Sequence, residues 1–239
     1  MTNIRIYPDK TELVQSLTEQ ILTIESESIK EEGRFSIALS GGSTPKALYQ
    51  HLAESDAFQW DKWYIFFGDE RTVPPDDDDS NYRMAKETFL SKVPIPENQV
   101  YRMKGELEPT VSAEAYERVL QDVFGDNGFP QLNLILLGMG DDGHTASLFP
   151  HTAPIHETEK WVIAHYVEKL DTWRITLTPP VLNNAHYVAF MVTGDKKADR
   201  LNQVIHGDYQ PDTLPSQIIK PEHGQLLWYV DQAAASHLE

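Results

Sequence analysis

A histidine stands close to an aspartate in a glycine-rich segment, residues 138–144 (GMGDDGH). Histidine has an unperturbed pKa of about 6.5, so it can accept and return a proton near neutral pH. Asp142 lies just before His144 in the segment and could orient its ring. A single histidine could equally be a structural group that caps a turn. The glycines and the carboxylate around His144 favour a general base.

A second segment has the residue types that bind an anion. Gly41 and Gly42 precede Ser43 and Thr44, and either of the last two could cap a helix. The glycines allow close backbone approach, and free N–H groups at a helix start attract negative charge. A tight turn between a strand and a helix has the same pattern, so both interpretations stay open. No lysine follows the glycines, which excludes a Walker phosphate loop.

Charged residues elsewhere could serve the same ligand. Asp69 and Arg71 follow an apolar segment directly, and they could form either a functional group at a strand end or a solvated loop with a local ion pair. Arg174 and Lys197 are each compatible with an ordinary surface charge. The chain is poor in cations, however, and an anionic ligand bound by an acidic protein needs some of them nearby.

These segments can meet only if they follow neighbouring strands of one sheet. Apolar runs predict strands at residues 35–39, 63–67, 132–137, 161–165, 174–177, 187–192 and 225–230. Helical spacing predicts helices at residues 9–24, 43–52, 80–89, 111–123 and 198–205, with the N-terminus leading straight into the first. Apolar strands alternating with helices predict an α/β fold: a doubly wound, mainly parallel sheet with helices on both faces. Ligands of such sheets bind beyond the carboxyl ends of the strands, so we expect one shared site there.

Composition narrows the class of protein. The chain has 239 residues, 40% hydrophobic and 24% charged, which is ordinary globular composition and predicts a single domain over residues 1–239. Lys and Arg total 20 against 37 Asp and Glu, a net charge of −17, which argues against nucleic acid or an anionic membrane as the main partner. The absence of cysteine excludes disulfides, thiolate zinc sites and a cysteine nucleophile.

Location and metal binding follow from what the sequence lacks. We see no signal peptide and no apolar run long enough to span a bilayer, so we expect a cytoplasmic protein. Leu238 and Glu239 resemble the junction of a C-terminal expression tag. The acidic run at residues 76–79 lacks the spaced ligands of a calcium loop, and no HExxH pair is present. We therefore expect a solvated turn there, no metal and no cofactor.

Several segments together resemble the 6-phosphogluconolactonase family. They are SGGSTP (40–45), GDER (68–71) with SNY (80–82), GDDGHTASLFP (140–150), RITLT (174–178) and GDKKA (194–198). They span nearly the whole chain in the family's order, and GDDGHTASLFP is the most specific. The resemblance implies hydrolysis of 6-phospho-D-glucono-1,5-lactone to 6-phosphogluconate in the pentose phosphate pathway, without a metal. It also implies the fold shared with glucosamine-6-phosphate deaminases.

Two other functions remain to be weighed. Deaminases carry a similar segment, DGHIAFNEP, and use its glutamate near the catalytic histidine; here that position is Phe149. The missing carboxylate favours the lactonase. Related folds also occur as sugar-phosphate sensors of transcription regulators. A sensor would normally add a DNA-binding helix-turn-helix segment. The acidic charge balance and the direct start of the sequence at its first strand–helix unit argue against such a segment.

The chemistry of lactone hydrolysis gives each catalytic candidate a role, and the resemblance supports that of His144 best. His144 would take a proton from water attacking C1 and return it to the ring oxygen. Asp142 would orient the imidazole, and Asp69 would position substrate hydroxyls or Arg71. Arg71 is also one candidate partner for the tetrahedral oxyanion.

The same proposal says how the rest of the substrate would be held. The N–H groups near Gly41 and Gly42 are the other candidates for the oxyanion. The phosphate would meet the helix start at residues 43–44, with Arg174 and Lys197 as cationic partners. A small sugar phosphate is then the only partner expected, bound by a monomer, with a dimer left open.

Overall fold

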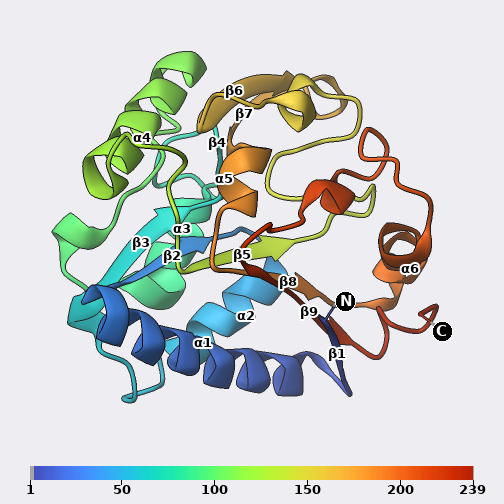
Figure 1. Cartoon of the computed structure of the whole chain (residues 1–239), viewed down its shortest axis with the longest axis horizontal. Coiled ribbons are helices and arrows are strands. Elements are labelled where there is room, and N and C mark those ends of the chain that lie inside the picture. Colours follow the sequence, from blue (N-terminus) through green and yellow to red (C-terminus); the bar gives the residue numbers. More distant parts are fainter. Residues whose placement is uncertain (1–2, 239) are drawn as a thin grey trace.

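The computed structural model describes residues 3–238 and is built on a six-stranded sheet. Its strands are β1 (Asn3–Tyr7), β2 (Phe35–Leu39), β3 (Trp63–Phe67), β5 (Leu134–Gly138), β8 (Tyr187–Val192) and β9 (Gln225–Asp231). They lie in the order β1-β9-β8-β5-β2-β3, and every neighbouring pair is parallel. Figure 1 shows this sheet running through the middle of the molecule.

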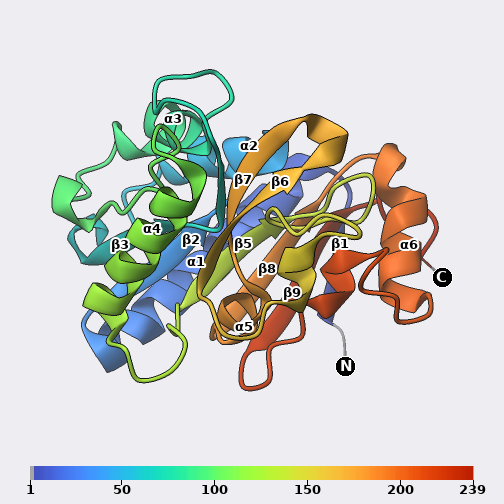
Figure 2. The same ribbon diagram turned by 90° about the horizontal axis from the view of Figure 1, so that it is seen from above.

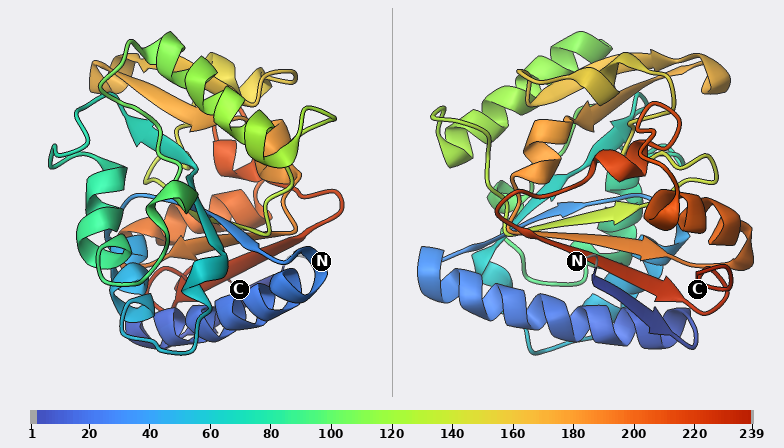
Figure 3. Two further views of the ribbon diagram at one scale, coloured as in Figure 1. Left: turned by 90° about the vertical axis from the view of Figure 1, so that its left-hand side faces the viewer. Right: turned by 45° about the vertical axis from the view of Figure 1, so that its right-hand side comes forward.

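Helices cover both faces of the sheet. They are α1 (Lys10–Glu32), α2 (Ser43–Leu52), α3 (Asn81–Ala85), α4 (Pro109–Phe124), α5 (Pro179–Asn183) and α6 (Ala198–His206). Short 3₁₀ turns lie at Trp60–Lys62, Glu97–Gln99, Ala153–His156, Glu168–Leu170, Asp195–Lys197 and Pro215–Ile218, and α3 continues into a π-helical turn at Lys86–Leu90. In Figures 1 and 3, α1 and α2 lie below the sheet while α4 and α5 lie above it. The predicted doubly wound α/β fold is confirmed.

A second, smaller sheet lies over the same face as α4 and α5. It contains β4 (Asp69–Arg71), β7 (Thr172–Leu177) and β6 (Val162–Val167), in that order and antiparallel. Figure 2 shows β6 and β7 crossing above β5 and β8. We predicted strands near β6 and β7 but did not foresee a separate sheet.

Two cores form because successive side chains of a strand point to opposite faces. All of β2 is buried, with Ile37 and Leu39 packed against α1 and α2 while Ala38 faces the α4 side. A strand covered on both faces reads as a continuous apolar run, which explains why the sequence revealed β2, β3 and β5 so clearly.

The helix starts follow local capping chemistry. The Asp9 carboxylate accepts the N–H groups of Thr11 and Glu12 and begins α1, as predicted. Ser80 accepts the N–H of Arg83 and begins α3, also as predicted. The predicted cap of α2, Ser43 or Thr44, is wrong, although the bounds of this helix are as predicted. The cap is Gly42, whose φ of 108° is favourable only for glycine, and Ser43 is already helical.

Two strands were missed. The N-terminus does not lead straight into α1, because Asn3–Tyr7 forms the edge strand β1 beside β9. Polar residues alternate with apolar ones over only five positions, a weak signal for an edge strand. The charges at Asp69–Arg71, which we considered as a loop, form β4 and pair with β7. This pairing joins segments about a hundred residues apart and has no local signature.

The strand order places the ligand crevice between β2 and β5. From β2 the chain moves outward to β3, whereas β5, β8 and β9 continue on the other side. Such a reversal point is where open α/β sheets bind ligands. The loops after β2 and β5 are the two glycine-rich segments identified above.

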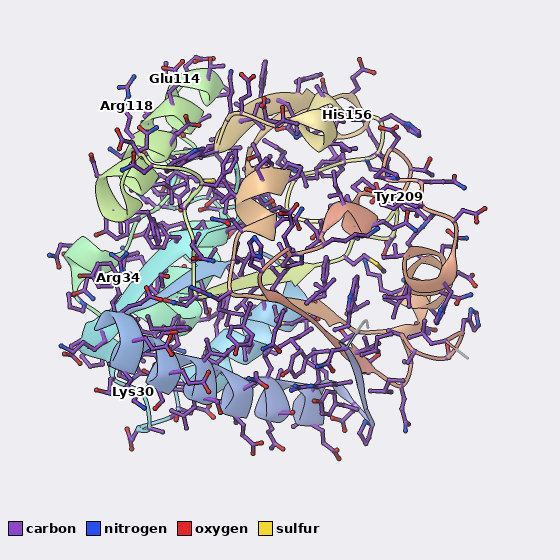
Figure 4. The ribbon with its side chains drawn as sticks, viewed as in Figure 1. Lys30, Arg34, Glu114, Arg118, His156 and Tyr209 are labelled. Carbon is purple, nitrogen blue, oxygen red and sulfur yellow. The ribbon has the colours of Figure 1, made fainter. Side chains whose placement is uncertain are left out.

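Many charges lie away from this crevice. Figure 4 shows Lys30, Glu114 and Arg118 at the periphery of the molecule, all three exposed. Glu114 and Arg118 form an ion pair along the outer face of α4. Among the helices of residues 3–238, none combines the length and the apolar character that crossing a membrane requires.

Candidate active site

A cavity of about 410 Å³ lies at the carboxyl ends of β2 and β5. The predicted site residues that line it are Gly41, Gly42, Asp69, Arg71, Asp142, His144, Arg174 and Lys197. The side chains of Ser43 and Thr44 lie outside it. Ser43 is exposed, whereas Thr44 is buried with its hydroxyl hydrogen-bonded to that of Thr193 at 2.8 Å. The fold thus joins residues from the loops after β2 and β5, from strands β4 and β7 of the second sheet and from the turn before α6.

The imidazole of His144 is paired with the carboxylate of Asp142. Nδ1 donates to Oδ1 at 2.6 Å, and the His144 backbone N–H donates to the same oxygen at 3.2 Å. Nδ1 is therefore committed to Asp142, and Nε2 is the nitrogen left to accept a proton from water. Burial raises the pKa of Asp142, but interactions with His144 and Lys169 outweigh it, so the pKa lies well below its usual range. The carboxylate stays ionised beside the ring.

The loop that carries this pair is tied to its surroundings by its own backbone. The N–H of Gly140 donates to the carbonyl of His144 at 2.8 Å. The hydroxyl of Thr145 donates to the Gly138 carbonyl at 2.8 Å. Gly143 has a φ of 83°, and its carbonyl accepts from both the N–H and the hydroxyl of Ser216. The glycines of the motif therefore allow a tight turn that fixes the imidazole.

Asp69 is a buried carboxylate at the opposite wall, only 7% exposed. Its oxygens accept the hydroxyl of Ser147 at 2.6 Å and the side-chain amide of Asn81 at 3.3 Å. Asp69 is therefore held by these two partners, and its predicted alternative role of positioning Arg71 has no hydrogen bond behind it. The His165 ring donates to the backbone carbonyl of Ser147 and leaves its hydroxyl to Asp69.

Two guanidinium groups face each other across the second sheet. Arg71 and Arg174 are direct partners in the β4–β7 ladder. Within residues 3–238 neither forms a salt bridge, and the buried Nε of Arg71 has no hydrogen-bond partner. Burial lowers the pKa of Arg174, and the positive charge of Arg71 lowers it further. Like charges directly opposite each other are destabilising, so an anion placed between them would relieve the repulsion.

Two lysines complete the positive lining. Lys197, at the end of the turn before α6, pairs with Asp141 at 2.5 Å, and this contact lowers the pKa of the Asp141 carboxyl. Lys169, on the turn between β6 and β7, contacts Oδ2 of Asp142 at 3.0 Å. Both ammonium groups thus balance the two aspartates of the histidine loop.

Sequence reasoning missed several residues of the cavity wall. Asn81, Ser147 and Phe149 stood inside recognised motifs, but no role was assigned to them. Their position inside these motifs was the sequence feature that could have revealed them. No sequence feature could have revealed Lys169, because an exposed lysine in a short turn is typical of any protein surface. Its place beside Asp142 depends on the β6–β7 pairing.

The acidic run at residues 76–79 is largely exposed, in line with the predicted solvated turn, but it also makes contacts of its own. The carbonyl of Asp79 accepts from Arg71 at 2.5 Å, and Asp78 pairs with Arg83 at 2.7 Å. Over the part of the chain that the structure describes, no group of three or more metal-ligating side chains is gathered in one place.

The fold and the cavity together define a doubly wound α/β protein in which a histidine–aspartate pair, two arginines and two lysines line one cavity. Residues 8–228 match the family described as glucosamine-6-phosphate isomerases/6-phosphogluconolactonase. The chain belongs to this family, as the sequence motifs predicted.

Known relatives cover the whole chain. The 6-phosphogluconolactonase of Nostoc sp. is 42% identical over 238 residues, 98% of both chains. The structure resembles the 6-phosphogluconolactonase from Trypanosoma cruzi with a TM-score of 0.89 and 30% identity, over 100% of this chain and 97% of that one. A monomeric glucosamine-6-phosphate deaminase has a TM-score of 0.82 at 18% identity, over 99% and 100% of the two chains, and shares the fold alone.

Proposed function

We propose that this chain is a 6-phosphogluconolactonase that hydrolyses 6-phospho-D-glucono-1,5-lactone to 6-phosphogluconate, a step of the pentose phosphate pathway. The observation that carries the proposal is the His144–Asp142 pair in a cavity that also holds Arg71 and Arg174. The pair can move a proton near neutral pH, and guanidinium groups bind phosphate through paired hydrogen bonds. The full-length likeness to enzymes of this name supports it.

In this proposal His144 acts as base and then as acid. Water attacks C1 of the lactone while Nε2 takes one of its protons, so C1 becomes tetrahedral and its former carbonyl oxygen becomes negative. The C1–O5 bond then breaks, the carbonyl of the new carboxyl group forms, and O5 takes the proton back from Nε2. Asp142 holds Nδ1 throughout and faces the imidazolium that exists between the two steps.

The negative oxygen of the intermediate needs hydrogen-bond donors already in place. The candidates are the backbone N–H groups near Gly41 and Gly42, and the guanidinium of Arg71. Only glycine fits at position 41, because a Cβ there would overlap the side chain of Asn81. Asp69, held by its two neutral partners, would accept hydrogen bonds from the sugar hydroxyls.

The phosphate would lie among the cations. We assign it to Arg174 and Lys197, with the N-terminal turn of α2 at residues 43–44 completing the site. The guanidinium of Arg174 lines the cavity and forms no salt bridge within residues 3–238, which supports this choice, as does Lys197 at the same cavity. Lys197 would exchange part of its contact with Asp141 for the more highly charged phosphate.

Residues 1–239 would act as one domain, and as a monomer, in the cytoplasm. The six-stranded sheet supports a single domain, since one sheet contains strands from both ends of the chain and pairs β1 with β9. The lack of cysteine fits a reducing compartment. Sedimentation of the purified chain at several concentrations tests the monomer.

The decisive experiment measures acid release from freshly prepared lactone at constant pH, corrected for spontaneous hydrolysis. Ammonia release from glucosamine 6-phosphate is measured in parallel. We expect lactone turnover without ammonia, because Phe149 stands where the deaminase motif has its glutamate. Ammonia without lactone turnover would replace the lactonase by the deaminase.

A further inference from the structure

Three residues contact the imidazole of His144, and the reaction scheme gives no role to two of them, Phe149 and Gly140. The ring of Phe149 stacks on it, with 4.2 Å between ring centroids and 25° between planes. Gly140 packs against it so closely that a Cβ there would overlap Nδ1 and Cε1. The carboxylate of Asp142 accepts the hydrogen bond of Nδ1 at 2.6 Å. These three contacts leave the ring one orientation.

Phe149 is itself firmly held. It is 7% exposed, and its carbonyl accepts the hydroxyl of Thr152 at 2.7 Å. The ring of His165 lies on its far side, 6.4 Å away between centroids. Phe149 lines both the reaction cavity and a neighbouring cavity of about 660 Å³, so its ring forms part of the wall between them.

An aromatic face carries partial negative charge and attracts a cation placed over it. The imidazole is neutral before the reaction and positive while it holds the proton of water. An aromatic ring stacked on the imidazole therefore interacts more favourably with its protonated, positive form than with its neutral form. An aliphatic side chain of similar size would fill the space but lacks this preference.

We propose that Phe149 is a positioning residue for His144, which fixes the imidazole and stabilises its protonated form during lactone hydrolysis. The proposal rests on the proposed function, since it assumes that His144 accepts the proton. It adds a second source of stabilisation for the imidazolium, besides the hydrogen bond that Nδ1 donates to Asp142.

A change in the pH profile of activity can be assigned to the Phe149 ring only if the charges around His144 stay constant. The charged and titratable groups around His144 are Asp141, Asp142, Lys169, Asp69, Arg71, Arg174, Lys197 and, behind Phe149, His165. Burial lowers the pKa of His165. Replacing Phe149 by leucine alters none of these groups and keeps the wall apolar.

The test compares Phe149→Leu with Phe149→Tyr in the lactone assay between pH 5 and 8. For Phe149→Leu we expect kcat to fall about three- to thirtyfold with KM changed less than about twofold. The acid limb of kcat/KM moves to lower pH by about half a unit to one and a half units, because the protonated ring is less stable. Phe149→Tyr keeps the aromatic face and stays within about threefold of wild type.

Phe58→Leu is the matched control, because Phe58 is 6% exposed and packs on Trp63 in the other core. It should lose a similar amount of stability and keep both kcat and the acid limb. An unshifted acid limb in folded Phe149→Leu, or an equal loss in Phe149→Tyr, overturns the proposal.

The two proposals fail in different ways. No lactone turnover by the wild-type chain overturns the proposed function. NMR titration of the His144 ring then decides on Phe149 without turnover: its midpoint should still move to lower pH in Phe149→Leu, and an unchanged midpoint refutes the contact. Wild-type turnover with an unaltered Phe149→Leu profile refutes the role of Phe149 alone.

Discussion

Replacing Asp142 by asparagine tests how the carboxylate supports His144. In the wild-type chain Oδ1 accepts Nδ1–H at 2.6 Å, and Oδ2 contacts Lys169 at 3.0 Å. Asparagine keeps the shape but offers a neutral oxygen to an imidazolium. Hydrogen bonds to charged groups contribute about 1.5–3 kcal/mol. Losing that much in the transition state lowers kcat about ten- to hundredfold.

The assay is initial-rate acid release from the lactone at pH 7, with spontaneous hydrolysis subtracted. KM should change less than about threefold, because Asp142 faces the imidazole and the substrate is held elsewhere. Asp9→Asn is the matched control, since it makes the same chemical change at the cap of α1, where asparagine caps equally well. A folded Asp142→Asn protein with kcat within about twofold of wild type would refute the reasoning.

The same variant predicts a pH dependence of stability. The pKa of Asp142 is lower in the folded chain than the unfolded value of about 3.9. Its stabilisation is therefore complete above the unfolded pKa and is lost as the pH falls through the folded pKa. Urea unfolding should show the largest difference between wild type and Asp142→Asn near neutral pH, and a smaller one at about pH 3. A difference that grows on acidification would contradict this sign.

Four further outcomes are expected. His144→Ala should lower kcat about 10²- to 10⁴-fold with an unchanged circular dichroism spectrum; near-normal turnover would remove His144 from the base role. Lys197→Ala should raise KM for the phosphorylated lactone about ten- to hundredfold, while unphosphorylated gluconolactone, a poor substrate of both proteins, should hardly respond; equal losses on both would place Lys197 at the reacting carbonyl. Exhaustive chelation should leave activity unchanged, and a loss restored by one divalent ion would reveal a metal site. Glu70→Gln should lower the free energy of unfolding by about 1–3 kcal/mol, because the buried carboxylate accepts the N–H groups of Asn81 and Tyr82; an unchanged urea midpoint would contradict that.

The sequence determined the elements whose physical signals are local. Strands β2, β3 and β5 are buried on both faces, so each is a short apolar run, and helices α1 and α3 begin at capping side chains. The glycines that follow β2 and β5 were enough to predict from the sequence where the ligand crevice lies. The His144–Asp142 pair was predictable for the same reason, because both residues belong to one turn and their contact needs no distant partner.

Only the tertiary structure decided contacts that depend on distant pairing. Arg71 and Arg174 face each other because β4 joins β7, and Lys169 reaches Asp142 because β6 and β7 form a hairpin above the parallel sheet. The sequence placed Phe149 in a motif but did not show that its ring stacks on His144. Side-chain direction and strand partners are set by packing over the whole chain, whereas caps, turns and apolar runs are set within a few residues.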